Sequence, residues 1–252
     1  FVSKKNKLIQ MKCFQKIFIT AIFFMLFTPS IKAQTDSVTS ELNQNNDWPN
    51  LRRYRSENAQ LTTPSKENRV VFMGNSITDG WINSSPDFFK NNPYLDRGIS
   101  GQTTPQMLIR FRQDVIDLKP KVVVILAGIN DIAGNTGPSS VQMIENNLIS
   151  MAQLAKANGI KVVMCSILPA YSFPWRAGID PVQSIIEVNK WMKSFAAKNH
   201  FVYCNYYDAL VDKRKGLPAN LSKDGVHPTE EGYKVMEPIV KKAIAQALGQ
   251  KE

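Results

Sequence analysis

The chain has 252 residues, 43% of them hydrophobic, with 31 basic and 21 acidic side chains. This length and composition predict one well-filled domain and exclude two large ones. Residues 1–33 hold six of the lysines and no acidic side chain, so the rest of the chain has 25 basic against 21 acidic side chains. A net charge of +4 spread along the chain argues against a nucleic-acid-binding protein.

Residues 1–33 have the features of a secretory signal. Lys12 and Lys16 precede a mostly apolar run at 17–27, and Ala33 is a small residue at a suitable cleavage position. The run is shorter than the roughly 20 residues that span a bilayer, which disfavours the alternative of a transmembrane anchor. The sequence therefore predicts a periplasmic or secreted protein. We expect a signal peptide at 1–33 with an upstream extension at 1–10, a flexible leader at 34–47, and a single domain at 48–252.

Short runs rich in valine and isoleucine alternate with helical patterns from residue 69 onward. The runs do not alternate polar with apolar residues, which is typical of strands buried on both faces. A strand–helix order repeated in this way predicts a three-layer α/β fold with a mainly parallel sheet. Strands are expected at 69–73, 94–99, 121–126, 160–167 and 201–207, and helices at 104–118, 139–159, 181–199 and 228–248.

The cysteines give no disulfide framework. Cys13 belongs to the predicted signal, while Cys165 and Cys204 each lie in an apolar run. A disulfide between these two is possible in an exported protein. We expect buried free thiols instead, because such cysteines behave as small hydrophobic residues.

Polar residues follow several of the predicted strands. Ser76 comes after the first strand, Gly101 after the second and Asn130 after the third, and Asp224 and His227 lie in a loop after the fifth. The carboxyl ends of parallel strands meet at one edge of the sheet, where such folds bind their ligands. We therefore expect these five residues to converge.

The types of residue at this edge suit nucleophilic catalysis. A serine is a poor nucleophile unless a base removes its proton. His227 is a candidate base, and Asp224, three residues before it, can orient the imidazole and stabilise its charged form. His200, the other histidine, ends a predicted helix and is expected to cap it. Taken alone, Ser76 could instead cap a helix, and the Asp224–His227 pair could be an ordinary polar turn.

Acyl transfer also needs hydrogen-bond donors where negative charge develops. The backbone N–H groups of Ser76 and Gly101 and the side-chain amide of Asn130 could form such an oxyanion hole. Glycine at position 101 would allow close approach of the backbone. The simpler alternatives are a turn at Gly101 and a loop cap at Asn130.

Several other catalytic motifs are absent from the sequence. The G-x-S-x-G elbow is not formed, since the residues around Ser76 read GNSIT, and there is no H-E-x-x-H, C-x-x-C or Walker sequence. We therefore expect no metal and no cofactor. Asp79, Asp131, Asp224 and His227 could in principle hold a metal, but a single histidine with scattered acids is a weak ligand set.

The segments GNSIT, GISGQ, GIND and DGVHP occur in this order between residues 69 and 235. Together they resemble the four blocks of the SGNH hydrolases, also called the GDSL esterase/lipase family. The resemblance implies a flavodoxin-like α/β/α sandwich with five parallel strands and a carboxylic ester hydrolase activity. It implies these roles: Ser76 as nucleophile, Gly101 and Asn130 in the oxyanion hole, and Asp224 and His227 completing the triad.

One position departs from the family pattern. The aspartate that the family carries beside its serine is Asn75 here. An amide keeps the hydrogen-bonding capacity and loses the charge, so we expect activity to persist with altered local electrostatics. The members most similar in character are acetylhydrolases of the platelet-activating-factor type and carbohydrate acetylesterases.

The loop at 168–181 is rich in aromatic residues and proline. Tyr171, Phe173, Trp175 and Arg176 could form a wall that stacks a sugar or shields an acyl group, or the loop could fold on its own aromatics. Trp81 could likewise narrow an acyl pocket or belong to the core. No long apolar stretch follows the predicted signal, which favours a short acyl group.

An exported esterase of this kind would meet glycans, so the sequence predicts deacetylation of an O-acetylated carbohydrate. The expected partner is a glycan or small-molecule ester, with no nucleic acid and no stable membrane insertion after signal cleavage. The alternatives are a lysophospholipase or thioesterase with the same machinery, a non-catalytic glycan-binding protein, and a phosphatase or metal hydrolase. The oligomeric state is left open.

Overall fold

The computed structural model describes residues 47–61 and 68–250. The predicted signal peptide, its Cys13 and the leader up to residue 46 lie outside the described residues. The strands are β1 (Val70–Gly74), β2 (Tyr94–Gly98), β3 (Val122–Leu126), β4 (Lys161–Cys165) and β5 (Val202–Cys204). The longer helices are α7 (Thr104–Asp114), α9 (Val141–Ala157), α10 (Val182–Asn199) and α12 (Glu230–Leu248). The short helices are α3 (Arg55–Gln60), α4 (Ser76–Asp79), α5 (Trp81–Ser84), α6 (Pro86–Lys90), α8 (Ile129–Ile132) and α11 (Tyr207–Leu210), with a 3₁₀ turn at Ile116–Leu118.

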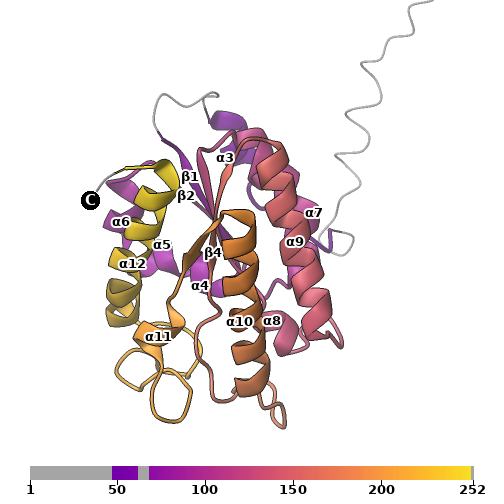
Figure 1. Ribbon diagram of the computed structural model, residues 1–252, viewed down its shortest axis with the longest axis vertical. Helices are drawn as coiled ribbons and strands as arrows, with labels where there is room; N and C mark the ends of the chain where they lie inside the picture. The colour runs from indigo at the N-terminus through magenta and orange to yellow at the C-terminus, as the bar shows by residue number, and fades with distance from the viewer. Residues whose placement is uncertain (1–46, 62–67, 251–252) are drawn as a thin grey trace, which may run out of the picture. The chain divides into compact units, whose positions relative to one another are not determined.

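The five described strands form one parallel sheet in the order β2-β1-β3-β4-β5. Helices cover both faces, with α5, α6 and α12 on one side and α7, α9 and α10 on the other (Figure 1). The predicted three-layer α/β/α sandwich with five parallel strands is therefore confirmed. Gly74 at the end of β1 is level with Gly98 of β2 and Leu126 of β3. This register brings the loops that follow these strands to one edge.

Each face of the sheet has its own apolar core. Val71 and Met73 of β1 pack with the α7, α9 and α10 side, whereas Val70 and Phe72 pack with the α5, α6 and α12 side. All four are at most 2% exposed. Burial on both faces explains why the strand runs show no polar alternation.

Local sequence signals set the helix ends. Thr103 and Gln106 form a capping box at the start of α7, and Ser140 accepts a hydrogen bond from the Met143 N–H at the start of α9. His200 has φ +59° directly after α10, so its predicted role as a helix cap is confirmed.

The helix predicted at 104–118 is shorter in the structure. It ends at Asp114, and Val115 has non-helical backbone angles (φ −132°, ψ −64°) before the 3₁₀ turn. Val115 and Leu118, two apolar residues of the predicted helix that lie beyond this break, are still buried, at 0% and 3% exposed. Residues beyond the end of the α-helix are as buried as those within it, so the hydrophobic pattern alone could not locate the helix end.

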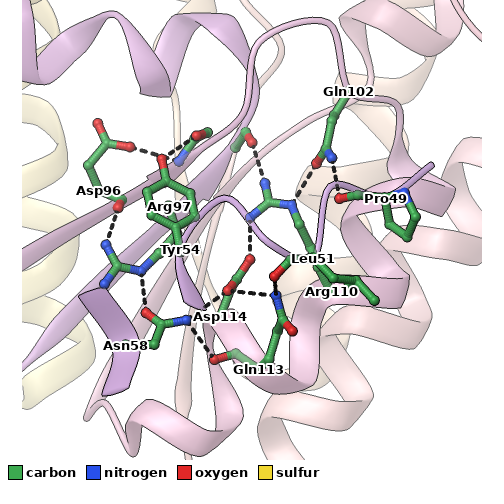
Figure 2. A network of polar contacts seen from close by, with 12 residues as sticks. Pro49, Leu51, Tyr54, Asn58, Asp96, Arg97, Gln102, Arg110, Gln113 and Asp114 are labelled. Atoms are coloured by element: carbon green, nitrogen blue, oxygen red, sulfur yellow. Dashed lines mark hydrogen bonds and ion pairs between the residues drawn. The ribbon is translucent and has the colours of Figure 1, made fainter. Parts of the chain in front are cut away.

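The segment before β1 docks onto α7 through polar contacts (Figure 2). Tyr54 is 3% exposed and donates a hydrogen bond to the carbonyl of Gly98. Asn58 donates to Asp114 at 2.9 Å and accepts from Arg97 at 2.9 Å. Tyr54 thus anchors this segment to the domain, whereas Trp48 is 51% exposed.

The two described cysteines are register partners on β4 and β5. They form no disulfide and are at most 1% exposed, which confirms the prediction of buried free thiols. Burial raises the pKa of Cys165 well above its ordinary value, so the thiol stays protonated. Among the helices of the described residues, none combines the length and apolar character needed to cross a bilayer.

Trp81 lies in the core rather than beside an acyl pocket. Its ring is 1% exposed and stacks at 5.1 Å on Phe88 and at 5.1 Å on Tyr233. We expect Trp81→Ala to lower the free energy of unfolding by about 3–5 kcal/mol, because it leaves a large cavity. Urea denaturation followed by circular dichroism measures this. Ile82→Ala, next in the chain at 42% exposure, is the matched control and should change stability by less than about 0.5 kcal/mol. Equal effects of the two substitutions would contradict the core assignment.

Candidate active site

The sequence-predicted residues lie in loops and short helices at the carboxyl edge of the sheet. Ser76 is the first residue of α4, two residues after β1 ends, and Asn130 lies in α8, directly after β3. Gly101 follows β2, and Asp224 and His227 lie in the segment that leads into α12. Residues separated by as much as 151 positions in the chain are thereby brought into contact.

Three side chains form a continuous hydrogen-bonded chain. Ser76 Oγ is 2.9 Å from His227 Nε2, and His227 Nδ1 is 2.6 Å from Asp224 Oδ2. Ser76 is partly exposed at the start of its helix, and the structure gives its hydroxyl an imidazole partner rather than a backbone cap. The geometry is that of a serine, a base and a carboxylate that orients the base.

The Asp224 carboxylate is held in its ionised form. Burial alone raises the pKa of Asp224, but hydrogen bonds from the N–H groups of His227 and Val226 and from the imidazole outweigh it, and the pKa falls to about 2. Its Oδ1 accepts from these N–H groups at 2.8 and 2.9 Å, while Oδ2 faces the imidazole. The same carboxylate therefore forms a polar turn through Oδ1 and contacts the imidazole through Oδ2, so the two expected arrangements of Asp224 and His227 occur together.

A close backbone contact sets α4 against the end of β2. A Cβ atom built on Gly98 would lie 2.1 Å from the Asp79 nitrogen, so only glycine fits there. Asp79 also accepts hydrogen bonds from the N–H and hydroxyl of Ser100, at 3.2 and 2.5 Å. These contacts fix the helix that carries Ser76 against the loop that carries Gly101.

The candidate oxyanion donors come from this loop and from α8. Gly101 has φ +79°, and a Cβ atom there would meet no protein atom within 4 Å, so the position needs glycine for its left-handed backbone. Asn130 is 3% exposed and donates one amide hydrogen to the carbonyl of Gln102 at 2.9 Å. Its second amide hydrogen has no acceptor among the hydrogen bonds of the described residues. Ser76 begins its helix, so its own N–H has no partner within that helix.

Two polar neighbours of the candidate site, Gln102 and Arg110, were not predicted from the sequence (Figure 2). Arg110 is fully buried and donates to the Gln102 side chain at 2.6 Å, to the carbonyl of Gly74 at 2.9 Å and to Asp114 at 3.1 Å. One guanidinium thus connects the strand end before Ser76 with the residue that holds Asn130. Arg110 and Asp114 are four residues apart on the buried face of α7. Two opposite charges at this spacing among the apolar residues of a predicted helix are the signal that could have revealed them.

Asp131 fixes the start of α7. It is 2% exposed and accepts hydrogen bonds from the Thr104 N–H, at 3.0 and 3.1 Å, and from the Thr104 hydroxyl at 2.6 Å. Burial raises the pKa of Asp131 to about 6, against the opposing effect of these hydrogen bonds. In residues 47–61 and 68–250, no three His, Cys, Asp or Glu side chains form a group suited to a metal ion. Asp79 and Asp131 are each engaged in structural contacts.

Asn75, the departure from the family pattern, is 1% exposed, and neither polar atom of its side chain has a hydrogen-bond partner among the described residues. An unpartnered carboxylate would be costlier to bury at this position than an amide. That activity persists with asparagine stays a prediction.

The rim loop between β4 and α10 combines both expected arrangements. Phe173 is 2% exposed and belongs to the core, while Tyr171 and Trp175 are 57% and 44% exposed. The centroid of the Trp175 ring lies 5.3 Å from that of Phe173 and 5.9 Å from that of the His227 imidazole. The loop is therefore partly folded on its own aromatics, and it also presents one indole to the candidate site.

Comparisons with known proteins identify the family of this chain. The family model described as GDSL-like Lipase/Acylhydrolase matches residues 72–235, more than half of the chain. A solved structure of a GDSL-like lipase from Bacteroides thetaiotaomicron has a TM-score of 0.77 and 51% sequence identity, covering 79% of this chain and 98% of that one.

Two curated relatives extend well beyond the matched region. The "Uncharacterized lipoprotein YqeF" of Bacillus subtilis is 31% identical over 164 residues, 58% of this chain and 58% of the relative. An acetylxylan esterase of Xylanibacter ruminicola is 28% identical over 218 residues, 70% of this chain and 43% of that protein. The chain thus spans about half the length of these relatives. The match of the family model to residues 72–235 shows that the chain belongs to the GDSL-like lipase/acylhydrolase family, a family of carboxylic ester hydrolases.

Proposed function

We propose that this protein is a serine esterase that removes short acyl groups, acetyl above all, from carbohydrates through an acyl-enzyme on Ser76. The observation that carries the proposal is the hydrogen-bonded chain from Ser76 Oγ through His227 to Asp224, at 2.9 and 2.6 Å. These distances are within the range over which a base can take a proton from a hydroxyl.

In the first step His227 Nε2 takes the proton of Ser76 as Oγ forms a bond to the ester carbonyl carbon. The ionised Asp224 stabilises the imidazolium that results. Negative charge develops on the former carbonyl oxygen, where the N–H groups of Ser76 and Gly101 and the free amide hydrogen of Asn130 would donate to it. The intermediate then expels the alcohol, which receives its proton from His227 Nε2, and an acyl-serine remains.

The second step reverses the roles of the same atoms. A water molecule loses a proton to His227 Nε2 and attacks the acyl carbon. The ester bond to Ser76 breaks, Oγ regains its proton from the imidazolium, and the free acid leaves. No cofactor is needed, because water is the only second reactant.

Three observations support a short acyl group on a sugar. Ile77 and Trp81, which follow Ser76, are 2% and 1% exposed and packed into the core, which supports a shallow site. The rim loop offers an exposed aromatic ring of the kind that sugar-binding sites use. One relative is named an acetylxylan esterase. Export to the periplasm or the medium stays a prediction from the sequence, because residues 1–33 lie outside the described part of the chain.

The competing candidates share the fold but differ in ligand. A lysophospholipase or thioesterase would use the same three side chains on a longer acyl chain. A non-catalytic glycan-binding protein would have no use for the Ser76–His227 hydrogen bond. The experiments below separate these candidates.

We expect Ser76→Ala and His227→Ala to lower kcat on p-nitrophenyl acetate by roughly 10⁴–10⁶-fold, since each removes an atom of the proton-transfer chain. An organophosphorus serine reagent should label the wild type and not Ser76→Ala. Ser194→Ala, the same change at an exposed position of α10, is the matched control and should retain full activity. Folded wild-type protein that resists labelling would favour the glycan-binding alternative.

The free amide hydrogen of Asn130 can be tested separately. We expect Asn130→Ala to lower kcat by roughly 10²–10³-fold with little change in KM, because the donor acts on charge that develops in the transition state. Asn146→Ala, on the exposed face of α9, is the matched control. A loss of less than threefold would remove Asn130 from the mechanism.

Acyl-chain preference distinguishes an acetylesterase from a lipase. With p-nitrophenyl esters from acetate to decanoate, we expect kcat/KM to be highest for acetate or propionate and to fall with chain length, because a shallow site cannot bury a long chain. Acetate release from acetylated xylo-oligosaccharides, measured enzymatically, should accompany it. Rates that rise toward decanoate would favour the lysophospholipase alternative.

A further inference from the structure

An exposed indole lies beside the imidazole of the proposed base. The ring centroids of Trp175 and His227 are 5.9 Å apart, with 38° between their planes. Trp175 keeps 44% of its surface in solvent, whereas Phe173, two residues earlier, keeps 2%. The loop has therefore buried one aromatic side chain and left the one nearest His227 accessible.

The indole is held in position by its neighbours. Its Nε1–H donates to Asn135 Oδ1 at 3.3 Å, and its ring packs on Phe173 at 5.3 Å. Arg176, the next residue, donates from Nη2 to the carbonyl of Gly134 at 2.7 Å and so pins the loop to the segment after α8. A ring held before binding loses little conformational entropy when a ligand stacks on it.

The chemistry of the first step determines which part of the ester lies near this ring. The leaving alcohol takes its proton from His227 Nε2, so the alcohol oxygen must lie within hydrogen-bond distance of that atom. The acyl part lies instead with Ser76 and the donors of Gly101 and Asn130. A ring that packs beside His227 is therefore placed to contact the alcohol part of the ester and not its acyl chain.

The surroundings of the indole favour a neutral sugar ring. Its Nε1–H is already engaged by Asn135, so the ring offers a ligand the apolar part of its 44% exposed surface. The face of an aromatic ring also attracts quaternary ammonium groups, but Arg176, the next residue in the chain, adds a positive charge to the same loop, which disfavours a cationic ligand. The C–H face of a pyranose or furanose ring is uncharged and flat enough to stack there.

We propose that Trp175 is the stacking platform for the sugar ring that carries the scissile ester, and that it gives the enzyme its preference for acetylated carbohydrates over other acetates. This inference rests on the proposed function. Trp175 acts on substrate binding alone, and the proton transfers remain with Ser76, His227 and Asp224.

The experiment compares three acetyl esters: an acetylated xylo-oligosaccharide, glyceryl triacetate, which has no ring, and acetylcholine, which is cationic. All three share the acyl group, so a disturbance of His227 would lower all three rates together. For Trp175→Ala we expect the ratio of kcat/KM for the sugar ester to that for glyceryl triacetate to fall roughly three- to tenfold, mainly through KM. Trp175→Phe should restore most of that ratio. Tyr171→Ala, which removes another exposed aromatic of the same loop, should leave it unchanged.

Each other outcome overturns the inference in a distinct way. An unchanged ratio in Trp175→Ala, or an equal fall in Tyr171→Ala, would reject Trp175 as the platform while the proposed function stands. A selective loss on acetylcholine would show a cation site instead. Wild-type enzyme that hydrolyses glyceryl triacetate but no acetylated sugar would reject the carbohydrate substrate and the platform together. Wild-type enzyme inactive on all three esters would reject the proposed function itself.

Discussion

The parallel register of the strands at their carboxyl ends is the constraint on which the candidate site depends. Gly74, Gly98 and Leu126 end neighbouring strands at one level, so the loops after them start side by side. Gly98 then lets α4 approach the end of β2 at a distance that no side chain would permit. The backbone alone therefore places Ser76 near the Gly101 loop, independently of the side chains of the candidate site.

A buried polar network supports this edge from behind. Arg110 joins Gly74, Gln102 and Asp114, and Gln102 in turn holds Asn130. The buried ion pair of Arg110 and Asp114 gives little net stability, because the cost of removing both charges from water offsets their mutual attraction. A fully bonded network does restrict the groups that it joins to one arrangement, which is what an oxyanion hole requires.

The two ends of the site differ in how they are built. The Ser76 side rests on tightly packed core, including Trp81 and its stacked neighbours, whereas the His227 side opens toward a loop with an exposed indole. Asp224 contributes to both turn geometry and imidazole orientation with separate oxygens. In the proposed mechanism the acyl group lies on the packed side and the alcohol on the side of the exposed indole, which suits the proposed restriction to short acyl groups.

Sequence patterns were enough to predict the parallel α/β class, the buried free thiols, the five candidate site residues and the positions of the polar segments after the strands. These follow from local patterns, since burial on two faces and residues placed after strands can be read along the chain. The sequence did not locate the end of α7, the core position of Trp81, or the Arg110–Gln102 link. Each of these depends on contacts between segments distant in the chain, and a sequence pattern that marks a side chain as apolar or charged does not say which neighbour it meets. The burial of Phe173 and the position of Trp175 beside His227 were found only in the structure, because they depend on contacts with segments distant in the chain, such as the hydrogen bond from Arg176 to the Gly134 carbonyl after α8.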